Sequence, residues 1–142
     1  GKSGKYEIND RLREKIDAVF IGGYNDDAQT KATISKTFRE YGYLVDTHTA
    51  VGLGVLEDVR KTAEPEGHTV VVSTASAYKF CGAVLEAIGE DCPDGLEQFE
   101  KLSKLTETPI PTPLAELAGK AVRFTDTIEK DEARNYVWQY TR

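Results

Sequence analysis

The sequence predicts an α/β chain that is mostly helical and contains one clear buried strand. Three observations lead to this fold class. Apolar residues recur at helical spacing over most of the 142 residues, as in Ile34, Phe38 and Tyr41. Several of these stretches begin at a capping residue and end at a glycine. The exception is Thr69-Val70-Val71-Val72-Ser73, a continuous β-branched run typical of a parallel sheet covered on both faces.

The first helical stretches are marked by their caps. Residues 10–21 carry an apolar stripe at helical spacing. Asp26 and Gln29 then form a capping-box pattern, in which each side chain satisfies a backbone N–H of the other residue. Gly42 stops this second helix, because glycine adopts the left-handed conformation that a helix end often requires.

A third helix is expected over about 49–62, capped by Asp46 or Thr47. It has little polar surface, so we expect it to be buried. Gly52 and Gly54 lie inside it, and each costs about 1 kcal/mol relative to alanine. Close packing against a neighbouring backbone would offset that cost.

Beyond the strand, helices are expected over 77–88 and after a second capping box formed by Asp94 and Glu97. A proline-rich link over 109–113 leads to a short helix, and we expect residues 1–142 to form a single unit. One strand does not make a sheet, because a buried parallel strand needs strand neighbours. We therefore expect these neighbours to lie outside the chain, and the chain to associate with itself through exposed apolar surface.

Composition excludes several classes of function. The net charge is −6 and the pI about 5.0, which disfavours nucleic acid and anionic membrane as partners, and no basic patch offsets this. No apolar run approaches the roughly 20 residues of a membrane span. Cys81 and Cys92 have no zinc-ligand spacing with His48 or His68, so no metal site is expected. Free thiols and the absence of a signal peptide predict a cytoplasmic location.

Two short segments are candidates for a site. Ser73-Thr74-Ala75-Ser76 presents three hydroxyls where the strand becomes a helix, and Lys79 follows in the first turn. Ligands of open α/β sheets bind at such places, and helix N-termini favour anions. The structural alternative is that Ser76 only caps the helix, Thr74 bonds a turn carbonyl and Lys79 is solvated. His48, at the head of the helix over 49–62, is the second candidate, although a lone histidine there is more often structural.

These segments resemble blocks of a known family, the threonine synthases. Asp46-Thr47-His48-Thr49-Ala50-Val51, preceded by Tyr41-Gly42-Tyr43-Leu44, resembles their G-Y-L-x-D-P-H-T-A-V block. Ser73-Thr74-Ala75-Ser76-Ala77-Tyr78-Lys79-Phe80 resembles their S-T-A-x-P-x-K-F block, and the segment from Pro113 through Arg123 resembles one near their C-terminus. Order and spacing agree over nearly the whole chain, which corresponds to the C-terminal third of the enzyme. The family usually has proline at the positions of Thr47 and Ala77, and often has another proline at the position of Cys81.

The resemblance implies a pyridoxal-phosphate enzyme with the three-layer, tryptophan-synthase-like fold of fold type II. Such an enzyme is a carbon–oxygen lyase acting on phosphates, and it converts O-phospho-L-homoserine and water to L-threonine and phosphate. By position in the family motif, Thr74 would face the pyridine nitrogen of the cofactor, with Ser73 as the second choice. His48 and Lys79 match motif positions and are the catalytic candidates, and Lys79 could help to hold a phosphate.

The S/A-F-K-D type motif that carries the Schiff-base lysine of the family does not occur in the sequence, and neither does a glycine-rich phosphate cup. The chain is therefore expected to be a C-terminal fragment that is inactive alone and binds no pyridoxal phosphate. Its partner in the parent enzyme would be the small-molecule substrate, without nucleic acid or membrane. The alternative is a self-contained acidic α/β module that recognises an anion at the turn over 73–79.

Overall fold

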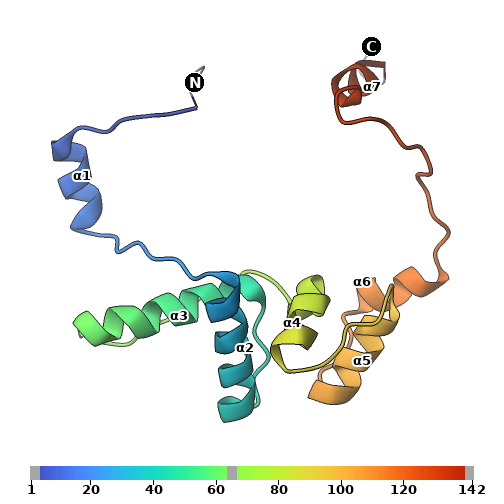
Figure 1. Ribbon diagram of the computed structural model, residues 1–142, viewed down its shortest axis with the longest axis horizontal. Helices are drawn as coiled ribbons and strands as arrows, with labels where there is room; N and C mark the ends of the chain where they lie inside the picture. The colour runs from blue at the N-terminus through green and yellow to red at the C-terminus, as the bar shows by residue number, and fades with distance from the viewer. Residues whose placement is uncertain (1–3, 64–66, 140–142) are drawn as a thin grey trace. The chain divides into compact units, whose positions relative to one another are not determined.

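The computed structural model describes residues 4–63 and 67–139, and these residues form helices joined by irregular segments (Figure 1). None of the described residues belongs to a strand. In chain order the elements are α1 (Asp10–Asp17), α2 (Asp27–Tyr41), α3 (Thr47–Thr62), the 3-10 helix η1 (Ala77–Phe80), α4 (Cys81–Ala87), α5 (Glu97–Thr106), α6 (Thr112–Ala115), the 3-10 helix η2 (Glu116–Gly119) and α7 (Ala133–Gln139).

The chain divides into two compact units, Gly1–Ile110 and Pro111–Arg142. In the first unit, α2 packs against both α3 and α4, and α4 packs against η1 and α5. In the second unit, α6 packs on η2, and no residue of the described part is fully buried. The apolar core of the first unit consists of Ile34, Val45, Ala50, Ala77, Tyr78, Cys81, Val84, Leu85 and Leu102.

The caps of α2 and its buried face follow the prediction. Asp26 Oδ1 accepts from the Gln29 backbone N–H at 2.8 Å, and Gln29 Oε1 accepts from that of Asp26 at 2.9 Å. Ile34 is fully buried, and Gly42 ends the helix with a φ of 63°, in the left-handed region that glycine adopts without strain. The first helix is shorter than expected and ends at Asp17. None of the residues of α1 is buried.

Close packing explains one of the two glycines inside α3. A Cβ atom on Gly54 would collide with the side-chain amide of Asn25, so a larger residue there would force that side chain to move. A Cβ atom on Gly52 would meet nothing within 4 Å. Neither glycine therefore packs against a neighbouring backbone as predicted, since the close neighbour of Gly54 is a side chain. The helix is only partly buried, with Thr49, Ala50 and Gly54 as its buried residues.

The expected strand is absent, and the α/β fold class is wrong for the described residues. Val70 is 82% exposed and Val72 is 73% exposed, whereas a strand covered on both faces would bury them. No backbone hydrogen bond joins 69–73 to other described residues. The β-branched run favours an extended backbone, but a ladder needs a second strand, and the described residues offer none. The segment therefore stays irregular.

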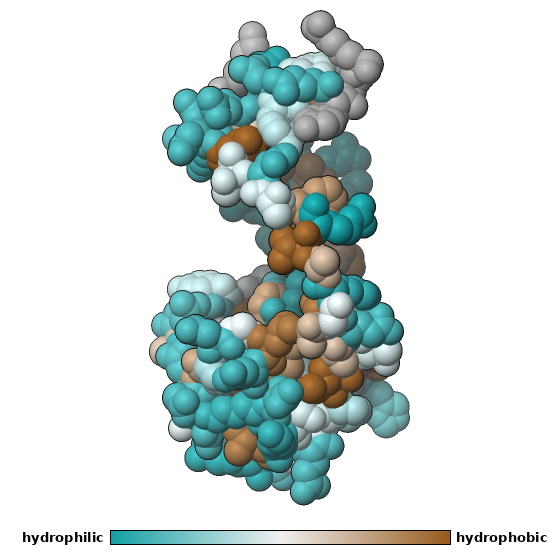
Figure 2. Space-filling view, turned by 90° about the vertical axis from the view of Figure 1, so that its right-hand side faces the viewer, coloured by the Kyte–Doolittle hydropathy of each residue, from teal (hydrophilic) through white to brown (hydrophobic). Residues whose placement is uncertain are grey.

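Apolar side chains are also exposed elsewhere. Figure 2 shows one face on which apolar residues lie among hydrophilic ones. The exposed large side chains include Val19, Phe20, Tyr41, Tyr43, Val122, Phe124, Val137 and Trp138. No helix in residues 4–63 or 67–139 combines the length and the apolar character needed to cross a membrane.

Candidate functional site

The first turn of α3 is organised by the buried carboxylate of Asp46. Its Oδ1 atom accepts the backbone N–H groups of His48 at 2.9 Å and Thr49 at 3.3 Å, and Oδ2 accepts the Thr49 hydroxyl in a short hydrogen bond. Burial alone raises the pKa of Asp46, but the hydrogen bonds from Thr49 and His48 outweigh it, so the pKa lies below its usual value. Asp46 is therefore the cap, one of the two residues predicted for this role.

A contact between hydroxyl groups joins this helix to the second predicted segment. Ser73 Oγ lies 3.3 Å from Thr49 Oγ1 and 3.4 Å from the carbonyl oxygen of Ala75. Because the Thr49 proton is engaged by Asp46, Ser73 can donate its own proton to Thr49 or to Ala75. The structure thus brings the two sequence motifs together.

The turn over 73–80 leads into η1 as the spacing predicts. Ser76 is the cap, and its hydroxyl accepts from the Tyr78 N–H at 3.3 Å. The first helical residues form a 3-10 turn before α4 begins at Cys81. Thr74 is exposed, and its hydroxyl makes no hydrogen bond to the described residues. Of the two residues predicted to contact the cofactor, Thr74 has no hydrogen bond to the described residues, whereas the Ser73 hydroxyl lies within reach of Thr49 and Ala75.

His48 and Lys79 meet at one aromatic ring. The His48 and Phe80 ring centroids lie 4.9 Å apart, and Lys79 Nζ lies 5.5 Å from the Phe80 centroid. The His48 side chain is 63% exposed, and its Nδ1 atom lies 3.5 Å from Asp46 Oδ1. Lys79 forms no ion pair within the described part of the chain. Both catalytic candidates are therefore exposed, and both lie beside the Phe80 ring.

Tyr78 connects the turn to residues at and beyond α5, a role that the sequence did not predict. It is 5% exposed, and its hydroxyl donates to the Thr108 carbonyl at 2.6 Å. Its ring meets Phe99 edge-on, with the centroids 6.2 Å apart. The one signal in the sequence was a tyrosine inside an otherwise small, polar turn. Its partner lies 30 positions away, so local pattern could not identify it.

A groove of about 420 Å³ opens beside Ser73. It lies in the first unit, where α2, the start of α3 and the irregular segment contribute its walls. Most of its lining is apolar, and Ser73 and Thr49 place hydroxyl groups on it. The lining residues are Thr37, Tyr41, Tyr43, Val45, Thr49, Leu53, Val71 and Ser73.

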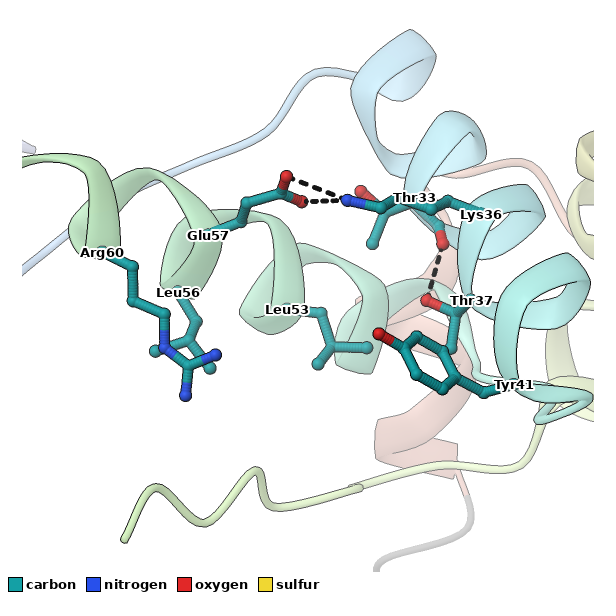
Figure 3. A pocket seen from close by; sticks show the side chains of 8 residues that line it. All are labelled: Thr33, Lys36, Thr37, Tyr41, Leu53, Leu56, Glu57 and Arg60. Carbon is teal, nitrogen blue, oxygen red and sulfur yellow. Dashed lines mark hydrogen bonds and ion pairs between the residues drawn. The ribbon is translucent and has the colours of Figure 1, made fainter. Parts of the chain in front are cut away.

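A second hollow, of about 210 Å³, lies between α2 and α3 (Figure 3). Lys36 reaches across it from α2 and contacts both carboxylate oxygens of Glu57 on α3, at 2.9 and 3.0 Å. The charges of Lys36 and Glu57 thus neutralise each other within the hollow. None of the predicted site residues lines it. Among the described residues, no group of three or more His, Cys, Asp or Glu side chains is placed to hold a metal ion.

A solved structure shares this arrangement of helices. The pyridoxal-phosphate-bound threonine synthase from Brucella melitensis matches 99% of the chain with a TM-score of 0.66 and 28% sequence identity. The match covers 26% of that protein. The fold and the turn over 73–80 therefore define this chain as similar to one part of a larger enzyme that binds pyridoxal phosphate.

The sequence comparisons identify the family. The model of the threonine synthase C-terminal family matches residues 49–137, and the chain belongs to this family. The threonine synthase of Methylobacillus glycogenes is 34% identical over 108 residues, which is 73% of this chain and 22% of that protein. That of Pseudomonas aeruginosa is 32% identical over 85 residues, covering 60% and 18%. The human threonine synthase-like 1 is 30% identical over 83 residues, covering 58% and 11%. The chain spans about a fifth of the two bacterial enzymes.

Proposed function

We propose that this chain supplies the C-terminal part of a threonine synthase, which converts O-phospho-L-homoserine and water to L-threonine and phosphate. The parent is then a carbon–oxygen lyase acting on phosphates. The observation that carries this proposal is the joining of the two family motifs by the Thr49–Ser73 contact. The proposal is supported by the contacts of His48 and Lys79 with Phe80 and by the family to which the chain belongs.

The hydroxyl groups fit one part of the expected cofactor. Pyridoxal phosphate, when bound, supplies an electron sink that stabilises carbanions on the substrate. Thr74 presents an exposed hydroxyl with no hydrogen bond to the described residues, which suits a partner for the pyridine nitrogen. Ser73 is the second choice, because its hydroxyl already lies within reach of Thr49 and Ala75. A hydroxyl, unlike a carboxylate, does not enforce protonation of that nitrogen.

His48 and Lys79 suit the charged groups of the substrate. The exposed ammonium of Lys79 can attract a phosphate, and Phe80 restricts where that ammonium lies. His48 can hold or release a proton at its ring, and Asp46 and Phe80 orient that ring. Both residues match positions of the family motifs, and this match is the reason for proposing these roles.

The parent protein must provide the remaining parts. The sequence contains no S/A-F-K-D type motif, so the Schiff-base lysine would come from elsewhere in the parent polypeptide. We therefore propose that residues 1–142 act as one part of a cytoplasmic enzyme whose ligands are small molecules. The chain alone neither turns over the substrate nor binds the cofactor. Its exposed apolar residues favour self-association when it is isolated. A self-contained anion-binding module is the less favoured alternative, since the family match covers most of the chain.

A chimera tests this proposal. The aligned segment of the Methylobacillus glycogenes threonine synthase is replaced by this chain, and phosphate release from O-phosphohomoserine is measured. We expect turnover by the chimera and none by the isolated chain. A chimera that folds and binds pyridoxal phosphate but releases no phosphate would count against the proposal, as would turnover by the isolated chain above a buffer blank.

A further inference from the structure

Cys81 and Cys92 lie on either side of one glutamine. Cys81 Sγ donates to the main-chain oxygen of Gln98 at 3.2 Å, and Cys92 Sγ lies 3.8 Å from the side-chain oxygen of the same residue. The Gln98 amide is held in place because its Nε2 atom donates to the Gly95 carbonyl at 2.7 Å. The two thiols thus share a neighbour, although one is buried and the other exposed.

An independent contact places the Cys92 sulfur beside the backbone of α4. A Cβ atom on Gly82 would lie 3.2 Å from Cys92 Sγ. Gly82 directly follows Cys81, and consecutive Cα atoms are about 3.8 Å apart. Disulfides form between Cα atoms roughly 4.4–6.8 Å apart. Cys92 lies in the irregular segment between α4 and α5, and forming the bond requires that segment to carry Cys92 Sγ to Cys81 Sγ.

We propose that Cys81 and Cys92 form an intramolecular disulfide when the chain meets a disulfide oxidant such as oxidised glutathione. The exposed Cys92 thiolate attacks one sulfur of the oxidant, and a glutathione thiolate leaves. Cys81 then loses its proton to solvent and attacks Cys92 Sγ, which releases the second glutathione. The two protein thiols give up two electrons and two protons, and the oxidant is reduced to two thiols.

The order of these steps follows from the surroundings of the thiols. Burial raises the pKa of Cys81 to about 11, with a smaller contribution from Cys92. Little Cys81 is therefore thiolate near neutral pH, and Cys92 reacts first. The bond closes the segment 81–92 and ties the start of α4, directly after Lys79 and Phe80, to the α4–α5 connection. This inference does not depend on the proposed function.

The test equilibrates the reduced 142-residue chain with mixtures of reduced and oxidised glutathione. Samples are quenched with acid, alkylated and analysed by intact mass and peptide mapping. We expect a monomer lighter by about 2 Da, the two hydrogens lost on oxidation, with Cys81 linked to Cys92. Wild-type chain that instead accumulates glutathione on Cys92, or forms disulfide-linked dimers, would overturn the proposal.

Two serine variants and one denatured control isolate the contribution of the fold. Cys81→Ser should stop at a single glutathione adduct on Cys92, and Cys92→Ser should remain unmodified while native. The effective concentration of the two thiols should be at least about tenfold higher in the native chain than in urea, since the unfolded chain must close the loop against its own entropy. Equal values in the two states would show that the fold does not hold the thiols together, and would refute the inference.

Discussion

Thr49 Oγ1 lies 3.3 Å from Ser73 Oγ, and this contact joins residues 24 positions apart in the sequence. The same Thr49 hydroxyl donates to the buried Asp46 carboxylate. A single side chain thus connects the cap of α3 to the turn that carries Thr74 and Lys79. The Thr49 hydroxyl therefore contacts a residue of each motif.

Replacing Thr49 by valine should destabilise the chain. Thr49→Val nearly keeps the shape but removes a hydrogen bond to a buried carboxylate, and hydrogen bonds to charged groups are worth about 1.5–3 kcal/mol. Urea unfolding followed by circular dichroism measures the loss. Thr62→Val is the matched control, because the exposed Thr62 hydroxyl bonds only the Val59 carbonyl, and it should cost less than about 0.5 kcal/mol. Equal losses in the two variants would contradict the role assigned to Thr49.

The stability of the chain should depend on pH through Asp46. Its folded pKa lies below the ordinary 3.8, because hydrogen bonds from Thr49 and His48 favour the charged form over the effect of burial. The carboxylate therefore contributes stability that is present above the unfolded pKa and is lost as pH falls through the folded pKa. We expect Asp46→Asn to be less stable than wild type by about 1 kcal/mol at pH 7, because a hydrogen bond to a charged acceptor is worth roughly that much more than one to a neutral acceptor.

The discriminating measurement is the difference between the two free energies of unfolding at several pH values. It should shrink as pH falls below about 3.8 and the wild-type carboxylate becomes neutral. A difference that stays constant from pH 7 to the acid limit of folding would show that the charge of Asp46 contributes nothing.

Self-association of the isolated chain should depend on the exposed valines. Val70 is 82% exposed and Val72 is 73% exposed, in an irregular segment without backbone partners among the described residues. Val70→Lys/Val72→Lys should move sedimentation velocity toward the monomer, because charge disfavours edge pairing. Val122→Lys/Phe124→Lys is the control, with 79% and 80% exposure in the other unit, and it should behave as wild type. A wild-type chain that is monodisperse and monomeric at high concentration would rule the expectation out.

Local signals predicted the helices that begin with a side-chain cap. The Asp26–Gln29 capping box, the Asp46 cap and the Ser76 cap are formed by residues within three positions of each other, so their chemistry is readable from the sequence. The predicted capping box of Asp94 and Glu97 does not form, and α5 begins at Glu97 without a side-chain cap. Gly95 lies between Asp94 and the helix with a φ of 61°, in the left-handed region that favours glycine.

Long-range structure could not be derived in the same way. The β-branched run over 69–73 favours an extended backbone. A strand forms only beside a partner strand, and the described residues supply none. The meeting of His48 with Phe80, and of Tyr78 with Thr108, depends on how α3, η1 and α5 pack. The motif resemblance indicated which residues belong together, and the structure supplied the contacts that join them.

The role proposed for Thr74 predicts a loss of turnover in the active chimera. Thr74→Val removes a hydroxyl that makes no hydrogen bond to the described residues, so the fold should remain intact. A neutral hydrogen bond is worth about 0.5–1.5 kcal/mol, and more when its partner is left buried and unpaired. A bond that strengthens as charge enters the cofactor ring acts mainly on kcat. We therefore expect kcat to fall roughly ten- to a hundredfold, with little change in KM.

Two companion variants separate Thr74 from Ser73. Thr74→Ser keeps the hydroxyl and should retain most of the activity. Ser73→Ala should lower kcat less than Thr74→Val, because the Ser73 hydroxyl already lies 3.3 Å from Thr49 and 3.4 Å from the Ala75 carbonyl, and part of its effect should appear as lower stability. A fully active Thr74→Val beside an inactive, folded Ser73→Ala would exchange the two roles. If neither variant changed kcat, the hydroxyls of this turn would be structural, and the cofactor nitrogen would have to find its partner elsewhere in the enzyme.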